Sequence, residues 1–315
     1  MIRQFRQDSN LAIIVFVMLL CAVFGFDVLA QKTKPLSERE RIRQAKVYFK
    51  RGHKCPETDY DCQIANYTNA IELNPKYDSA YYNRGIAFDG KGEKDLAVKD
   101  YSKAIELNPK ESDAFYNRGI IYYDRKQYAP AIEDFSKAIQ LKPKDADYYY
   151  NLALAYQYSD DYESAVKNYD KVIELNPKIS DAFYNRAIIY DDWGEYDKAI
   201  AGYTRAIELS PNEADSYINR GISYEGKGEY DLAIKDYDKA LEFLPNDADN
   251  YYNRANAYRQ KDDNLQAVKD YTKAIELNPN EPNYYNNRAI AYDELGETEK
   301  AAADRQKYKE LTEKP

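Results

Sequence analysis

A short motif, Asn-Arg followed by Gly or Ala, returns every 34 residues along most of this 315-residue chain. It begins at Asn83, Asn117, Asn185, Asn219, Asn253 and Asn287. In the intervening copy, Asn151 is followed by Leu152 and Ala153. A fixed period of this length is typical of one supersecondary unit stacked many times. Since each unit contacts only its neighbours, the pattern predicts one elongated solenoid instead of two globular domains.

Each period contains the pattern of two helices. In the unit spanning residues 78–111, one apolar face is formed by Tyr81, Gly85 and Phe88, and a second by Ala97, Tyr101 and Ala104. Such spacings place side chains on one side of an α-helix. Gly92 suits the turn between the two helices, and Pro109 stops the second helix. Each unit is therefore predicted to be a helical hairpin that needs neighbours to bury both of its faces.

This arrangement resembles the tetratricopeptide repeat (TPR). An aromatic residue is followed by Gly or Ala four positions later and by an aromatic after three more, then by Ala, Tyr and Ala across a turn and by a closing Pro. The resemblance covers residues 45–315 in eight units. It implies an all-α fold, an α-solenoid that winds as a right-handed superhelix of about eight TPR helix-turn-helix hairpins. In such proteins the first helix of each hairpin lines a concave groove.

Residues 1–30 carry the pattern of a signal peptide. Arg3 and Arg6 precede an uncharged run over residues 11–26, and Ala30 offers a small residue at a cleavage site. We therefore expect an exported protein, periplasmic or extracellular, after cleavage near Ala30. The alternative is a retained membrane anchor, for which the run is shorter than the ~20 residues of a spanning helix. Residues 31–44 are expected to form a basic linker and the start of the first helix, although their Lys and Arg oppose the usual charge bias of export.

The charge distribution excludes one class of partner. Residues 31–54 carry a net charge of +7, whereas residues 55–315 carry −16. Because nucleic-acid phosphates need a basic face, we expect no nucleic-acid partner. Acidic residues near the ends of the first helices are expected to attract Lys or Arg of a ligand: Asp89, Asp124, Asp191, Asp192, Glu225, Asp293 and Glu294. A second acidic row, explained by the preference of acids for helix N-termini, is Asp113, Asp147, Asp181, Asp215 and Asp249.

Cys55 and Cys62 lie seven residues apart in the first unit, which is one residue short before Tyr67. In an exported protein such a pair is a disulfide candidate. We expect the bridge to replace packing that the shortened hairpin lacks. The alternative is that both are small buried residues. A metal site is not expected, because only His53 is near.

The Arg of the motif has an acidic residue sixteen positions later. We expect structural ion pairs inside each hairpin, and the alternative is pairing with the preceding unit. The predicted pairs are Arg84 with Asp100, Arg118 with Asp134, Arg220 with Asp236, Arg254 with Asp270 and Arg288 with Asp304. At Arg186 the corresponding position is Gly202.

The TPR resemblance also implies which side chains line the groove. They are Tyr82, Tyr116, Tyr150, Tyr184 and Tyr252, followed in sequence by Asn83, Asn117, Asn151, Asn185, Asn219, Asn253 and Asn287. Side-chain amides both donate and accept hydrogen bonds, which suits the backbone of an extended peptide. The alternative is that the Asn residues stabilise the fold.

These features predict a non-catalytic scaffold that binds an extended, neutral-to-basic polypeptide in the concave groove. The alternative is a membrane-tethered accessory or assembly subunit of an envelope complex, held by residues 11–26. We do not expect an enzyme, because His53 is the only His and phosphate-binding fingerprints are absent. No cofactor is expected.

Overall fold

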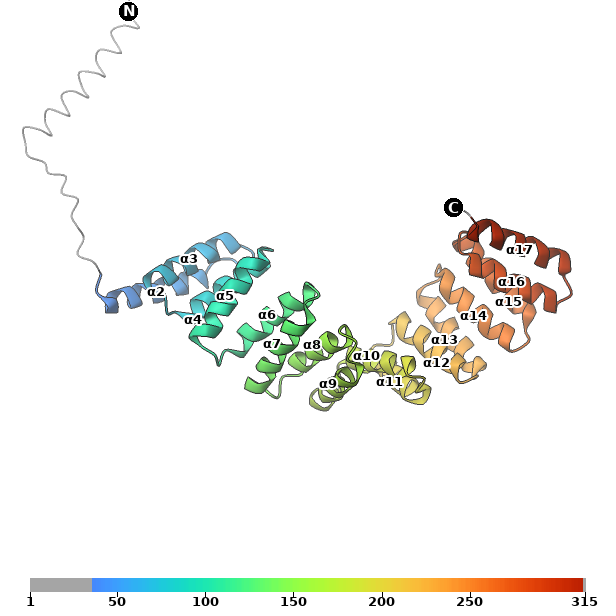
Figure 1. Ribbon diagram of the computed structural model, residues 1–315, viewed down its shortest axis with the longest axis horizontal. Coiled ribbons are helices and arrows are strands. Elements are labelled where there is room, and N and C mark those ends of the chain that lie inside the picture. The colour runs from blue at the N-terminus through green and yellow to red at the C-terminus, as the bar shows by residue number, and fades with distance from the viewer. Residues whose placement is uncertain (1–35, 314–315) are drawn as a thin grey trace, which may run out of the picture. The chain divides into compact units, whose positions relative to one another are not determined.

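The structure is a computed structural model that describes residues 36–313. These residues form sixteen α-helices and no strand, and successive helices pack in pairs (Figure 1). The predicted all-α solenoid of helical hairpins is therefore confirmed. The predicted targeting segment, residues 1–30, lies outside the described residues. Within the described residues, no helix is long and apolar enough to cross a membrane.

The helices group into two compact units, and the boundary follows Leu107. The first unit contains two hairpins, formed by α2 (Glu38–Gly52) with α3 (Tyr60–Leu73) and by α4 (Asp78–Gly90) with α5 (Lys94–Leu107). Helix α2 has a side-chain N-cap, because the Ser37 hydroxyl accepts a hydrogen bond from the Glu40 backbone N–H at 3.2 Å.

The second unit contains six hairpins. In chain order its helices are α6 (Ser112–Asp124), α7 (Tyr128–Leu141), α8 (Ala146–Gln157), α9 (Tyr162–Leu175), α10 (Ser180–Asp192), α11 (Tyr196–Leu209), α12 (Ala214–Gly226), α13 (Tyr230–Phe243), α14 (Ala248–Gln260), α15 (Asn264–Leu277), α16 (Pro282–Glu294) and α17 (Thr298–Thr312).

One buried aromatic side chain per hairpin joins its two helices. Tyr237 of α13, for example, is fully buried against Gly221 of α12. A Cβ atom on Gly221 would lie 2.7 Å from the Tyr237 ring, so the small residue lets the ring enter. The other buried members of this column are Tyr67, Tyr101, Phe135, Tyr169, Tyr203 and Tyr271. In the last hairpin Arg305 takes this place and pairs with Asp293, which gives α17 a polar character.

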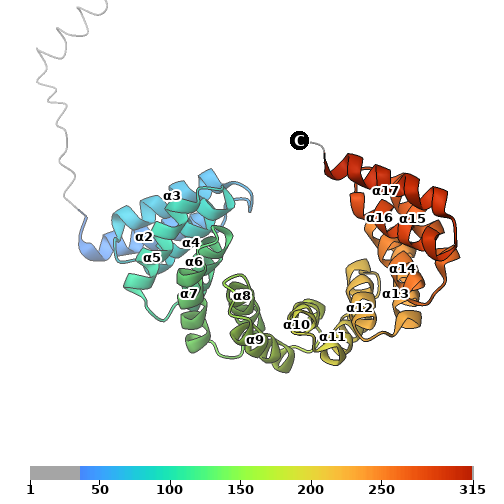
Figure 2. The same ribbon diagram turned by 45° about the vertical axis from the view of Figure 1, so that its right-hand side comes forward.

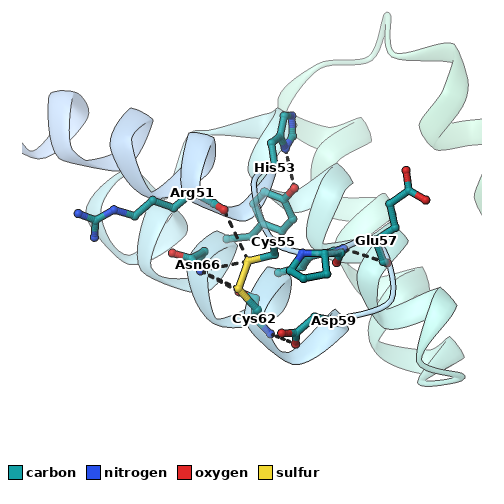
Figure 3. The surroundings of a disulfide bond; sticks show 10 residues. Arg51, His53, Cys55, Glu57, Asp59, Cys62 and Asn66 are labelled. Atoms are coloured by element: carbon teal, nitrogen blue, oxygen red, sulfur yellow. Dashed lines mark hydrogen bonds between the residues drawn. A yellow bond between two sulfur atoms is a disulfide. The ribbon is translucent and has the colours of Figure 1, made fainter.

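The turn inside each hairpin, except the first, uses one residue with a positive φ angle. These residues are Gly92, Lys126, Asp160, Gly194, Gly228, Asp262 and Gly296, again 34 apart. The first hairpin has no such residue. Its turn is closed instead by the Cys55–Cys62 disulfide, whose Cα atoms are 5.9 Å apart. Figure 3 shows the bridge beside Asn66, whose amide approaches both sulfurs.

Candidate functional site

The first helices of the second unit form one layer. Contacts join α6 to α8, α10 to α12, α12 to α14 and α14 to α16. Within this unit, α8, α10 and α12 lie on the inner side of the curve and their partners on the outer side (Figure 2). We call the surface of these first helices in residues 108–313 the groove face. The predicted Asn residues are all half-buried, as are the predicted Tyr residues.

The Asn and Tyr residues of the groove face bind each other. The Asn side-chain amide donates a hydrogen bond to the hydroxyl of the Tyr that lies 35 residues earlier, on the preceding hairpin. The bonds are Asn151 to Tyr116 at 2.8 Å, Asn185 to Tyr150 at 3.1 Å, Asn219 to Tyr184 at 2.8 Å and Asn287 to Tyr252 at 2.8 Å. We call these four bonds the Asn–Tyr ladder. Ile218 stands 35 residues before Asn253 and has no hydroxyl to accept such a bond.

The ladder corrects one expectation about the amides. At least one hydrogen of each ladder amide is used inside the protein. Asn151 uses a second on the Asp147 carbonyl at 3.0 Å. The side-chain oxygens of Asn151, Asn185 and Asn219 remain as acceptors. Asn185 and Asn219 each keep one amide hydrogen, so the groove face offers acceptors and fewer donors than expected.

Tyr116, Tyr150 and Tyr184 of the ladder stay protonated over the physiological range. Burial, with a smaller contribution from Asp147, raises the pKa of Tyr116 to about 12. Burial also raises the pKa of Tyr150 and of Tyr184. Each hydroxyl accepts from Asn and keeps its own hydrogen, with which it can donate to a neighbouring acceptor.

Two other residues predicted for the groove, Asn83 and Tyr82, lie in the first unit. Asn83 donates to the Ser79 carbonyl of its own helix at 2.8 Å, and the Tyr82 ring lies 5.9 Å from the Tyr101 ring. Asn117 lies half-buried on α6.

Most acids near the ends of the first helices have internal partners, and their role in attracting a ligand stays a prediction. Asp89 pairs with Lys94, and Asp293 pairs with Arg305. The Ser223 hydroxyl donates to Asp191, and the Tyr237 hydroxyl donates to Glu225. Burial raises the pKa of both of the latter carboxyl groups. By contrast, Asp147, Asp181 and Asp215 of the second row are exposed at the starts of α8, α10 and α12.

The motif arginines form the five predicted pairs with the Asp of their own hairpin. Each pair is bidentate: in Arg220, Nε and Nη2 each lie 2.7 Å from an oxygen of Asp236. The carboxylates of all five pairs are buried. Hydrogen bonding to Asp134 raises the pKa of the Arg118 guanidinium. These arginines are therefore held in ion pairs inside their own hairpins.

The same arginines also reach the preceding hairpin, so both pairings considered from the sequence occur. Nη1 of Arg220 donates to Thr204 at 2.9 Å, and Nη1 of Arg254 pairs with Asp238 at 2.5 Å. Of these two kinds of pairing, Arg186 makes only the one with the preceding hairpin, to Asp170. Gly202 replaces the Asp of its own hairpin. The Arg186 Nε atom is buried without a partner.

A pocket on the groove face was missed by the sequence reasoning. It has a volume of about 350 Å³ and is lined by Ser180, Asp181, Tyr184, Asp215 and Ser216, among others. We call it the Ser216 pocket. The signal lay in one column of the repeat, which changes from unit to unit: Ala114, Tyr148, Ala182, Ser216, Asn250 and Tyr284. Among the described residues, no group of three or more His, Cys, Asp or Glu side chains has the arrangement of a metal site.

Comparison with protein families gives a consistent set of matches. A tetratricopeptide repeat model matches residues 79–111, 112–145, 146–179, 180–213 and 214–247. A second TPR repeat model matches residues 255–296, and a third matches residues 236–269. The curated proteins gave no significant match.

Solved structures with a similar fold include three informative cases. The MamA protein is 32% identical, with a TM-score of 0.52 over 56% of this chain and 96% of that chain. YrrB, described as a TPR protein with an unusual peptide-binding site, is 26% identical, with a TM-score of 0.53 over 57% of this chain and 92% of that chain. The C-terminal part of a TPR protein from Cytophaga hutchinsonii is 20% identical, with a TM-score of 0.63 over 78% and 98%, and supports the fold alone.

Proposed function

Because the chain belongs to the tetratricopeptide repeat family, whose members bind protein or peptide partners, we propose that its groove face binds an extended, neutral-to-basic polypeptide. Family membership by itself indicates an interaction scaffold, since TPR proteins are generally non-catalytic. The peptide-binding description of the YrrB structure supports the proposal that the ligand is an extended polypeptide.

The Asn–Tyr ladder is the observation that carries this proposal. It directs amide hydrogens toward the preceding hairpin and leaves a row of amide oxygens, at Asn151, Asn185 and Asn219, on one face. An extended peptide presents backbone N–H groups at regular intervals, and these would donate to such oxygens. The exposed carboxylates of Asp147, Asp181 and Asp215 on the same helices favour Lys or Arg in the ligand.

A matched pair of variants tests the role of the ladder. Peptides are selected from a random phage-displayed library on the full chain, and their affinities are measured by fluorescence anisotropy. The combined change of Asn151, Asn185 and Asn219 to Ala removes both the oxygens and the ladder bonds. The combined change of Tyr116, Tyr150 and Tyr184 to Phe removes the same bonds but keeps the oxygens. We expect the Asn→Ala variant to lose binding and the Tyr→Phe variant to keep most of it.

The outcome separates the two roles considered for the Asn residues. Equal loss of stability in both variants, with loss of affinity only in the Asn→Ala variant, supports peptide binding. If selected peptides bind the Asn→Ala variant as well as the original chain, the ladder is structural and the ligand lies elsewhere.

A second candidate function is that of a tethered accessory or assembly subunit of an envelope complex, and it rests on the uncharged run over residues 11–26. Export is supported by Arg3 and Arg6 before this run, and a disulfide between Cys55 and Cys62 suits an oxidising compartment. Mass spectrometry of the N-terminus after cell fractionation distinguishes the two. A chain that begins near Gln31 in the soluble exported fraction indicates the scaffold, and an intact N-terminus in the membrane fraction indicates the tether.

A further inference from the structure

The Ser216 pocket lies where two first helices of the second unit meet. Helix α10 contributes Ser180, Asp181 and Tyr184, and α12 contributes Asp215 and Ser216. Ser216 is only 4% exposed and is one of the residues that line the pocket. Its volume of about 350 Å³ falls within the range of small-ligand sites, about 300–1,000 Å³.

The equivalent place is filled by a tyrosine two repeats earlier and two repeats later. Tyr148 stands 68 residues before Ser216, and Tyr284 stands 68 residues after it. Both are buried, at 3% and 1% exposure. The chain therefore contains two examples of the side chain that this place accepts.

Both tyrosines make the same two contacts. The Tyr148 ring lies 4.7 Å from the Tyr116 ring, and its hydroxyl donates to the Asp113 carboxylate. The Tyr284 ring lies 5.0 Å from the Tyr252 ring, and its hydroxyl donates to Asp249. Each ring thus packs on a ladder tyrosine of the preceding hairpin. Its hydroxyl reaches the acid at the start of the helix that carries this ladder tyrosine.

The Ser216 pocket retains both contact groups and lacks only the tyrosine. Tyr184 occupies the place of Tyr116 and Tyr252, and Asp181 occupies the place of Asp113 and Asp249. Ser180 likewise stands in the place of Ser112, which lies 3.4 Å from the Tyr148 hydroxyl. The Ser216 side chain is too short to reach Asp181 and Tyr184 together.

We infer that the Ser216 pocket takes a tyrosine side chain of the bound polypeptide. The ring packs on Tyr184 and the phenol hydroxyl donates to Asp181, as Tyr148 and Tyr284 do with equivalent residues of the preceding hairpin. This inference rests on the proposed function, since the tyrosine belongs to a peptide on the groove face. A phenylalanine fits the same space but cannot donate to the Asp181 carboxylate, which in its absence keeps the Ser180 hydroxyl at 3.3 Å, and loss of the phenol hydrogen bond reduces binding.

The inference is tested on the full chain with small probes in place of the unknown peptide. Saturation-transfer NMR measures binding of N-acetyl-tyrosinamide, N-acetyl-phenylalaninamide and N-acetyl-lysinamide. We expect the tyrosine probe to bind about tenfold more tightly than the phenylalanine probe, which corresponds to about 1.4 kcal/mol. Asp181→Ala should abolish this difference. Equal binding of the two aromatic probes, or stronger binding of the lysine probe, would overturn the inference.

The Ser216→Tyr variant provides the sharper control. Its new side chain is expected to fill the pocket from inside and to abolish binding of the tyrosine probe, whereas Ser216→Ala should retain it. Thermal unfolding checks that Ser216→Tyr is folded, and we expect its melting temperature to be unchanged or raised. If Ser216→Tyr proves unfolded, the effect of Asp181→Ala on the difference between the tyrosine and phenylalanine probes decides whether the inference holds.

Selected library peptides separate this inference from the proposed function. Peptides that depend on the ladder Asn residues but are not enriched in Tyr, and that bind Ser216→Tyr normally, overturn the tyrosine pocket alone. If no peptide depends on the ladder, the proposed function fails; binding of the tyrosine probe that is lost in Ser216→Tyr would then still support the pocket.

Discussion

Arg220 and Asp236 show what a single residue contributes to each hairpin. Asp236 is buried, Arg220 is partly buried, and the pair is bidentate. Removing one charge of a buried pair leaves the other without compensation, which typically costs about 3–5 kcal/mol. We expect Asp236→Asn to lower the free energy of unfolding by about 3 kcal/mol, near the lower end because Asn keeps one acceptor oxygen. Urea unfolding followed by circular dichroism measures this change.

An exposed pair in the same unit provides the control. Lys227 lies 2.8 Å from Asp197, whose side chain is 86% exposed. Because solvent screens such a pair, Asp197→Asn should change stability by less than about 1 kcal/mol. Equal destabilisation by both substitutions would contradict a special role for the buried pair, and a loss of affinity for groove peptides in Asp236→Asn alone would contradict its purely structural assignment.

Sequence spacing predicts contacts inside a hairpin better than contacts between hairpins. The separation of sixteen residues between Arg220 and Asp236 recurs in five units, so the pair was predictable. The contact of Arg220 with Thr204 and the bond of Asn219 to Tyr184 depend on how two hairpins pack, which periodicity does not specify.

The turn between α6 and α7 is a strained element. Lys126 has a φ angle of 57°, whereas four of the six other hairpin turns with a positive φ place Gly there. A side chain in this left-handed region costs about 1–2 kcal/mol, although Gly loses more entropy on folding. We therefore expect Lys126→Gly to raise the free energy of unfolding by up to about 1 kcal/mol. Urea unfolding midpoints of this variant and of the reverse change, Gly228→Lys, should shift in opposite directions.

The first hairpin depends on a covalent link in place of a left-handed turn residue. The Cys55–Cys62 bridge closes a loop of about eight residues, for which the chain-entropy argument gives about 2–3 kcal/mol. Reduction is expected to increase hydrogen exchange of α2 and α3 while leaving α8 to α17 protected, because stability in a repeat array is local. Two free thiols in the unfolded, non-reduced protein would refute the bridge. Unchanged exchange after reduction would show that it adds no stability.

Helix bounds and turns follow from the 34-residue period, but the division of the chain into units does not. The repeat pattern continues through Leu107 and Asn108 without interruption, and the boundary between the two compact units nevertheless lies there. The Ser216 pocket was also hidden, because the period describes what units share. The pocket arises from a difference between them, the absence at Ser216 of the ring that Tyr148 and Tyr284 provide.

At the scale of the whole molecule, charge and hydrogen-bonding capacity favour the same class of partner. Residues 55–315 carry a net charge of −16. The groove face adds amide oxygens and exposed carboxylates, while Arg118, Arg220, Arg254 and Arg288 are held in pairs with buried carboxylates. A ligand that supplies donors and positive charge complements this surface, and an acidic ligand would be repelled.

This complementarity predicts a specific dependence on salt. For a library-selected peptide that contains Lys or Arg, we expect affinity to fall by about tenfold between 0.05 and 0.5 M NaCl, mainly through slower association, as the screening length shortens from above 10 Å to below 8 Å. The same peptide with Lys and Arg replaced by Gln should bind more weakly at low salt and lose little further affinity. If instead both peptides respond equally to salt, the exposed acids of α8, α10 and α12 do not contact the ligand charges, and recognition rests on the amide oxygens and the Ser216 pocket.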